Sequence, residues 1–174
     1  MLKIRITFFI LLVSIAAAPV WAQMGKLELK EIASREDSLK SYSNTIVNGR
    51  DAAARFRADS SFTRILVRAL KEKNSFYYPF DSLQTISRIY APDSSFRIFT
   101  WQVVRDDNLN RRHGAIQMHT ADGSLKLYPL LDKTFEIRNL NDTITNPQAW
   151  VGAIYYRIIE KEFSGKRFYT LLGY

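Results

Sequence analysis

The chain has 174 residues, with 25 Lys and Arg against 17 Asp and Glu, a formal charge of +8, and no Cys. The absence of Cys excludes a disulfide framework, thiol catalysis, a Cys-type zinc site and an acylated lipoprotein anchor. Because 47% of the residues are hydrophobic and 13% are aromatic, the composition is typical of a folded chain, and the length suits one domain or two small ones.

The first 22 residues have the pattern of an export signal. Lys3 and Arg5 precede an uncharged apolar run over residues 6–18, and Val20 and Ala22 then place small side chains where a signal peptidase reads them. This pattern predicts a signal peptide over residues 1–22, cleavage between Ala22 and Gln23, and a periplasmic or secreted protein. The alternative is a retained membrane anchor, but an apolar run of about 13 residues is shorter than the roughly 20 that span a bilayer.

The charge that remains after cleavage is spread evenly along the chain. Residues 23–174 hold 23 basic and 17 acidic side chains, a charge of +6, and residues 23–93 and 94–174 each contribute +3. The longest basic run is Arg111–Arg112, followed by His113, and a solvated turn explains it. Nucleic-acid binders usually gather their basic residues in a stripe, so we expect no nucleic-acid partner. No second long apolar run occurs, so we expect no integral membrane segment after cleavage.

Two helices are expected first. Apolar residues recur at steps of three and four between Lys26 and about Ile46, and Glu36 interrupts this stripe. The break at residues 48–51 offers Asn48 as a helix cap, and a second amphipathic helix follows to about Lys73. The two helices are expected to pack as an antiparallel pair.

After an aromatic linker at residues 76–80, the apolar period changes from 3.6 to 2. This pattern predicts strands near residues 85–90, 96–105, 114–120, 125–131, 135–137, 150–162 and 167–172. Turns are expected at 91–94, 121–124 and 163–166, and polar loops at 106–112 and 139–147. In the strand 96–105, Ile98 and Val104 share one face and Phe99, Trp101 and Val103 share the other, as in a central strand covered on both sides.

The predicted fold class is therefore α+β, with two N-terminal helices followed by an antiparallel sheet of about six or seven strands. The expected segments are the signal peptide 1–22, a helical segment 23–74 and a β domain 75–174. The expected core includes Phe99, Trp101, Trp150, Ile154 and Ile158. The last strand-like run, 166–174, is apolar and has no closing turn, which predicts either an incomplete chain or an unpaired edge strand.

Three sequence blocks carry a resemblance. They read FDSLQTISRIYAPDSSFRIFTW at 80–101, WVGAIYY at 150–156 and FYTLLGY at 168–174. In this order they resemble a family of uncharacterised exported proteins of Bacteroidota, over about residues 76–174. The resemblance implies export and a chain that continues past the LLG motif. It implies no activity, so it assigns no catalytic residue.

Candidate chemical sites are few. His113 and His119 are six residues apart, about 20 Å in a straight strand, which is too far to bind one metal ion. The segment that holds Asp106, Asp107, Asn108 and Asn110 has oxygen ligands at short intervals, but it lacks the glycine and the distal Glu of an EF-hand loop. We therefore expect no metal and no cofactor.

Two classes of function stay open. Four aromatic residues could form a sugar- or peptide-binding surface, although a core position is the commoner role for such residues: Trp101, Trp150, Tyr155 and Tyr156. Four carboxylates could serve a hydrolase if the fold assembled them: Asp81, Asp132, Glu136 and Glu160. The favoured interpretation is a non-enzymatic envelope or secreted module that binds an envelope protein or glycan. The alternative is a secreted hydrolase of polysaccharide or peptide.

The export signal leads to a first prediction. The secreted or periplasmic form should begin at Gln23, because the small residues before it mark the cleavage site. Mass spectrometry of the N-terminal peptide measures this directly. A mature protein that still carried Met1 would contradict the prediction.

Overall fold

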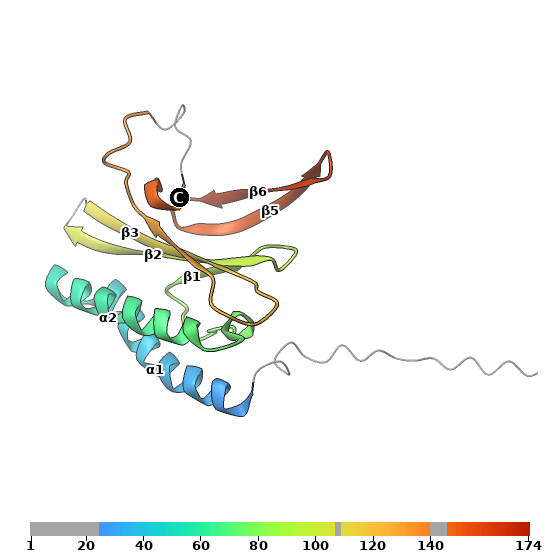
Figure 1. Cartoon of the computed structure of the whole chain (residues 1–174). Helices are drawn as coiled ribbons and strands as arrows, with labels where there is room; N and C mark the ends of the chain where they lie inside the picture. The colour runs from blue at the N-terminus through green and yellow to red at the C-terminus, as the bar shows by residue number, and fades with distance from the viewer. Residues whose placement is uncertain (1–24, 107–108, 140–145) are drawn as a thin grey trace, which may run out of the picture.

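The computed structural model describes residues 25–106, 109–139 and 146–174, and it has three layers (Figure 1). Two helices cover one face of a four-stranded sheet, and a two-stranded hairpin covers the other face. The predicted α+β class is confirmed, with two helices followed by antiparallel strands. The strands form two sheets, of four and two strands, where the sequence predicted a single sheet of six or seven.

The helices are α1 (Lys26–Asn48) and α2 (Ala52–Lys71). Their apolar stripes face each other and the sheet, and the fully buried members include Ile32, Leu39 and Phe62. The cap of α2 differs from the prediction. Asp51 is the N-cap, and its carboxylate accepts a hydrogen bond from the backbone N–H of Ala54 at 2.7 Å, whereas Asn48 is the last residue of α1.

A short 3-10 turn, η2 (Ser75–Tyr77), leads from the helices to the first sheet, which has the order β1-β2-β3-β4. These antiparallel strands are β1 (Ser87–Tyr90), β2 (Phe96–Asp106), β3 (Leu109–Met118) and β4 (Leu127–Leu131). The predicted polar loop 106–112 is wrong in part, because β3 already begins at Leu109. Each of its residues from 109 to 118 has a cross-strand partner on β2, and this pairing outweighs their polar character.

The second sheet is the hairpin of β5 (Tyr155–Phe163) and β6 (Lys166–Gly173), which follows the 3-10 turn η3 (Pro147–Ala149). The segment 135–137, predicted as a short strand, lies in a turn, which the backbone bond from Glu136 N–H to the Lys133 carbonyl helps to close. Among the described strands β6 pairs with β5 alone, so its other edge is unpaired.

β2 is the central strand, as its alternation predicted. Phe99, Trp101 and Val103 face the helices and join the larger core, whereas Ile98 faces the hairpin and joins a second core with Trp150 and Ile158. All five expected core residues are buried. The larger core takes residues from both sides of residue 74, so the helices and the sheet share it. No helix in the described part of the chain is long and apolar enough to cross a membrane.

Arg97 of β2 is buried between the sheet and the linker, with an exposed fraction of 1%. Its guanidinium donates to the carbonyls of Ser75 (2.8 Å) and Tyr78 (2.6 Å) and to the side-chain oxygens of Gln117 (2.8 Å) and Tyr90 (2.7 Å). Rings surround it, the nearest being Phe99 at 4.8 Å from the guanidinium carbon. Burial lowers the pKa of Arg97 to about 10, and the Tyr90 hydroxyl opposes this, so the group stays charged at neutral pH.

This arrangement generates a stability prediction. Arg97→Met should lower the free energy of unfolding by about 3 kcal/mol or more, because it leaves buried carbonyl and amide acceptors without donors. The matched control is Lys30→Met, an exposed residue of α1, which should change it by less than about 0.5 kcal/mol. Urea unfolding followed by Trp fluorescence measures both. Equal losses for the two variants would contradict the structural role of Arg97.

Candidate functional site

A hollow of about 640 Å³ lies where the start of α2 meets the end of β2 and the start of β3. Phe56 of α2 forms one wall, and Phe135, in the turn after β4, forms another. Arg105, Arg111 and Asp132 also line it, together with Leu109 and Asn110. The hollow therefore combines aromatic faces with cationic, amide and carboxylate groups, a mixture that suits binding of a polar ligand with an apolar face.

Two sets of contacts hold the hollow in shape. On the helix side, Arg55 donates to the Val104 carbonyl and to the Gly49 carbonyl, both at 2.9 Å, which ties the start of α2 to the end of β2. On the strand side, β3 pairs with β2 so that Arg111 lies opposite Val103 and shares the helix-facing side with it. The walls on α2, β2 and β3 thus come from regular elements whose relative positions these contacts fix, and Phe135 comes from the turn after β4.

Asp132 fixes the turn that carries Phe135. Its carboxylate accepts hydrogen bonds from the backbone N–H and hydroxyl of Thr134 (3.0 and 2.6 Å) and from the backbone N–H of Arg112 (3.2 Å). Gly152 packs against it with a φ of +63°, and a Cβ there would lie 2.9 Å from the carboxylate oxygens. Burial alone would raise the pKa of Asp132, but these hydrogen bonds hold it below its ordinary value of 3.8. The carboxylate is therefore ionised near neutral pH.

A buried cluster lies one helical turn along α2 from Phe56. Asp59 accepts a hydrogen bond from the indole N–H of Trp101 at 2.7 Å, and the His113 ring stacks on Trp101 with an interplanar angle of 14°. His113 Nε2 lies 3.4 Å from the second carboxylate oxygen of Asp59. Burial lowers the pKa of His113 below its ordinary value of 6.5, with Asp59 opposing the shift, so the ring is neutral at neutral pH.

The four carboxylates that could serve a hydrolase each have partners other than one another. Asp81 pairs with Arg88 at 3.4 Å, Glu136 with Lys133 at 2.6 Å, and Glu160 lies 3.9 Å from Arg167, while Asp132 holds its own turn. Within the described ranges, no hydrogen bond or ion pair links any two of these four. Every described carboxyl with a shifted pKa, including Glu36 and Asp93, has it lowered. A general acid would need the opposite shift.

Glu36, which interrupts the apolar stripe of α1, anchors the linker. Its carboxylate accepts hydrogen bonds from the Tyr78 hydroxyl, from the Ser82 hydroxyl (2.7 Å) and from the Ser82 backbone N–H (3.0 Å). Burial raises its pKa, but these hydrogen bonds lower it by more. The charged residue in the stripe is therefore structural.

The four aromatic residues proposed as a binding surface do not form one exposed surface. Trp101 and Trp150, each 4% exposed, belong to different cores, and the Trp150 indole N–H donates to the Tyr155 hydroxyl at 2.9 Å. Tyr156 alone is well exposed. The core interpretation of both Trp residues is therefore confirmed.

Both histidines have partners within the fold. His113 lies against Trp101 and Asp59, and His119 Nε2 lies 2.6 Å from the Tyr77 hydroxyl. No group of three or more metal-ligating side chains occurs in residues 25–106, 109–139 or 146–174. Three predictions lie wholly or partly outside the described residues, namely the signal peptide 1–22 with its cleavage site between Ala22 and Gln23, the Asp107–Asn108 part of the oxygen-rich loop, and most of the polar loop 139–147.

Sequence reasoning missed Phe56 and Phe135 as site residues. Phe56 was assigned to the apolar face of its helix, and Phe135 to a short strand. The one signal in the sequence is an aromatic residue, Phe135, set among the polar and charged residues of 132–136. In the comparisons with known proteins, no family model, no curated protein and no solved structure matches this chain.

The partly buried His113 generates a pH prediction. The pKa of His113 is lower in the folded chain than in the unfolded chain, because burial favours the neutral ring. The stability that comes with the neutral ring is therefore fully present above about pH 6.5 and is lost as the pH falls through the folded-state pKa. His113→Gln should therefore flatten the fall in the free energy of unfolding between about pH 7 and pH 5. The lowered carboxyl pKa values act in a separate window, below about pH 4.5. Urea unfolding at several pH values measures the effect, and His119→Gln is the matched control. Equal slopes for both variants and the unmodified protein would contradict the role of His113.

Proposed function

We propose that the protein is an exported, non-enzymatic binding module of the cell envelope or its surroundings. The export signal at residues 1–22 supports the location, and the blocks at 80–101, 150–156 and 168–174 support kinship with exported proteins of Bacteroidota. The observation that carries the binding role is the hollow between Phe56 and Phe135, whose aromatic faces lie beside the side chains of Asn110 and Arg111. We propose a glycan or peptide of the envelope as its ligand.

The geometry favours binding over hydrolysis. Two carboxylates at a controlled separation, one with a raised pKa, are the usual requirement for glycoside hydrolysis. Asp132 is the single carboxylate among the described residues that line the hollow, and its pKa is lowered. Its two oxygens are already engaged by Thr134 and Arg112. This carboxylate therefore suits holding the turn that carries Phe135 better than proton transfer.

The test is NMR titration of the isotope-labelled protein with defined oligosaccharides and peptides. Ligands that bind should shift the side-chain amide of Asn110 and the backbone amide of Arg111. Phe135→Ala should weaken binding by on the order of tenfold, because it removes an exposed aromatic face. The matched control is Phe163→Ala, which removes another well-exposed ring, at the end of the hairpin, and should leave affinity unchanged.

Three outcomes would overturn the proposal. One is equal effects of the two Phe variants, and another is shifts confined to other surfaces. The third is turnover of a probe that Asp132→Asn abolishes, which would establish the hydrolase instead.

A further inference from the structure

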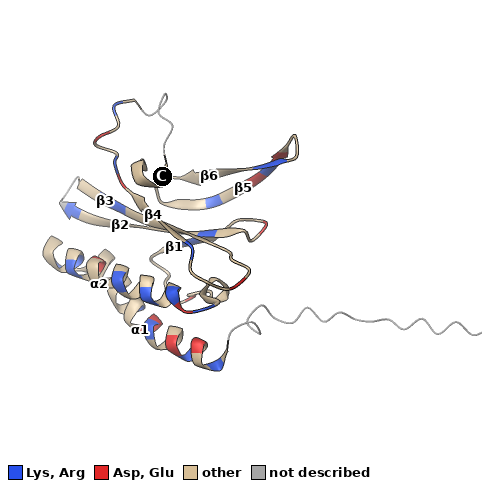
Figure 2. Cartoon of the chain, viewed as in Figure 1, with Lys and Arg blue, Asp and Glu red and all other residues tan. Residues whose placement is uncertain are grey.

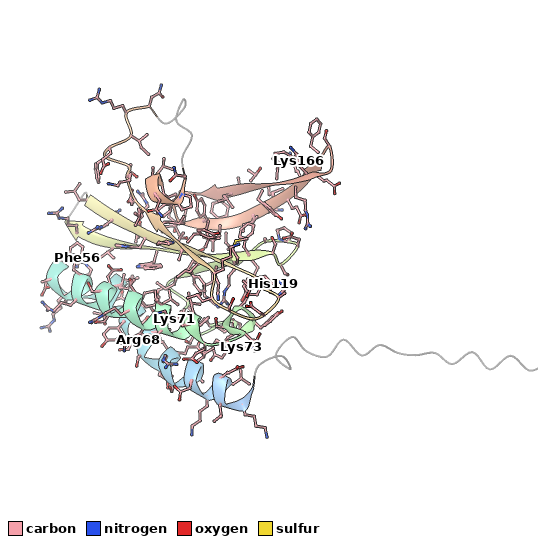
Figure 3. The ribbon with its side chains drawn as sticks, viewed as in Figure 1. Phe56, Arg68, Lys71, Lys73, His119 and Lys166 are labelled. Atoms are coloured by element: carbon pink, nitrogen blue, oxygen red, sulfur yellow. The ribbon has the colours of Figure 1, made fainter. Side chains whose placement is uncertain are left out.

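The exposed face of α2 carries a line of positive charge. From residue 57 to residue 71, every exposed residue is Arg57, Ser60, Arg64, Arg68 or Lys71. The four cations follow one another at steps of seven, four and three residues, so they lie along one side of the helix. We call Arg57, Arg64, Arg68 and Lys71 the cationic stripe. Figure 2 shows basic residues along α2, and Figure 3 labels Phe56 near the start of the helix and Arg68 and Lys71 toward its end.

In the described part of the chain, no acidic side chain forms an ion pair with the stripe. The one acidic residue within α2, Asp59, is buried against Trp101 on the opposite side of the helix. Among the described ion pairs none involves a member of the stripe, whereas Arg35 of the neighbouring α1 pairs with Glu31 and with Glu72. α1 has four basic and four acidic residues, so the excess charge belongs to α2. An array of unpaired cations of this kind attracts a polyanion.

Shallow hollows join the stripe to the site already described. Phe56 lines both the large hollow and a second one of about 380 Å³, which Arg57, Ser60 and Arg64 also line. Ser61 and Arg64 then border a third, of about 210 Å³, that reaches Arg68. The track from Phe56 to Lys71 spans 15 residue steps along the helix, or about 22 Å. Its length exceeds that of a small anion and suits several units of a polymer.

We propose that the large hollow and the cationic stripe together bind one extended chain of an acidic polysaccharide. This inference rests on the proposed function and names its ligand class. A chain seated in the hollow would place carboxylate or sulfate groups beside the cations of α2, and the hydroxyls of Ser60 and Ser61 between those cations would meet its sugar hydroxyls. Arg105 and Arg111 extend the positive potential into the hollow itself.

Two other polyanionic partners fit less well. Single-stranded nucleic acid is held by successive bases stacked on aromatic rings; the hollow offers Phe56 and Phe135, but the exposed residues of α2 between 57 and 71 include no aromatic ring on which further bases could stack. A helix that lies in a membrane inserts its apolar face, but the apolar face of α2, with Phe62, Leu66 and Leu70, is buried in the core.

The experiment measures affinity for a sulfated dextran oligosaccharide by isothermal titration calorimetry over a range of salt concentrations. Arg64→Gln combined with Arg68→Gln should weaken binding on the order of tenfold at low salt. It should also reduce the slope of log affinity against log salt by about one to two, since two ionic contacts are lost. The matched control, Lys26→Gln with Lys30→Gln, removes the same charge from the exposed surface of α1 and should change affinity by less than about twofold.

The outcomes separate this inference from the proposed function. If Phe135→Ala weakens binding but the Arg64 and Arg68 variant does not, the stripe inference is wrong and the binding module stands. If the α1 control weakened binding equally, the loss would follow from the lower net charge and not from the stripe, and the inference would be overturned. Equal binding of neutral dextran of the same length would also overturn it. Tighter binding to duplex DNA, single-stranded DNA or phosphatidylglycerol vesicles than to the sulfated oligosaccharide would overturn the choice of a polysaccharide.

Discussion

The buried guanidinium of Arg97 constrains the path of the chain between the helices and the sheet. A fully charged group can lie inside a protein only if its donors find acceptors, and here the acceptors are two backbone carbonyls and two side-chain oxygens rather than a carboxylate. Residues 75 and 78 must therefore turn their carbonyls toward β2. The linker meets this demand with left-handed conformations at Asn74 and Phe80 (φ of 61° and 54°), which few non-glycine residues adopt.

The same constraint positions the candidate site. The linker holds α1 through Glu36 and holds β2 through Arg97, so the helical layer meets the sheet in one register. With that register fixed, Asp59 reaches the indole of Trp101 and Arg55 reaches the carbonyl of Val104. The start of α2 then lies beside the end of β2 and the start of β3, and the hollow forms between them. The site is thus a consequence of how two layers dock.

The distribution of charge on the surface depends on which acidic side chains accept hydrogen bonds within the fold. Four of them accept hydrogen bonds that hold the fold, namely Glu36, Asp59, Asp93 and Asp132. Asp93, for example, joins the turn before β2 to Tyr169 of β6. The basic residues of α2 have no such internal role, apart from Arg55. The protein carries only a modest net charge, yet the exposed face of α2 is positive. The reason is that Asp59, the one acidic residue of that helix, is turned inward.

The sequence by itself determined the elements: two amphipathic helices, the alternation of β2, the hairpin turns and the buried Trp residues all follow from periodicity and local turn chemistry. It could not decide that the strands divide into sheets of four and two, because strand pairing depends on contacts between distant segments. Local polarity misled at 106–112, where cross-strand pairing overrides it, and it gave no sign of the structural roles of Glu36 and Arg97, whose partners lie far away in the sequence. The even count of charges in the two halves hid the cationic stripe, since a helix gathers residues that a linear count separates. The hollow was decided only by tertiary structure, because its walls come from α2, β2, β3 and the turn after β4, and no local pattern records that these meet.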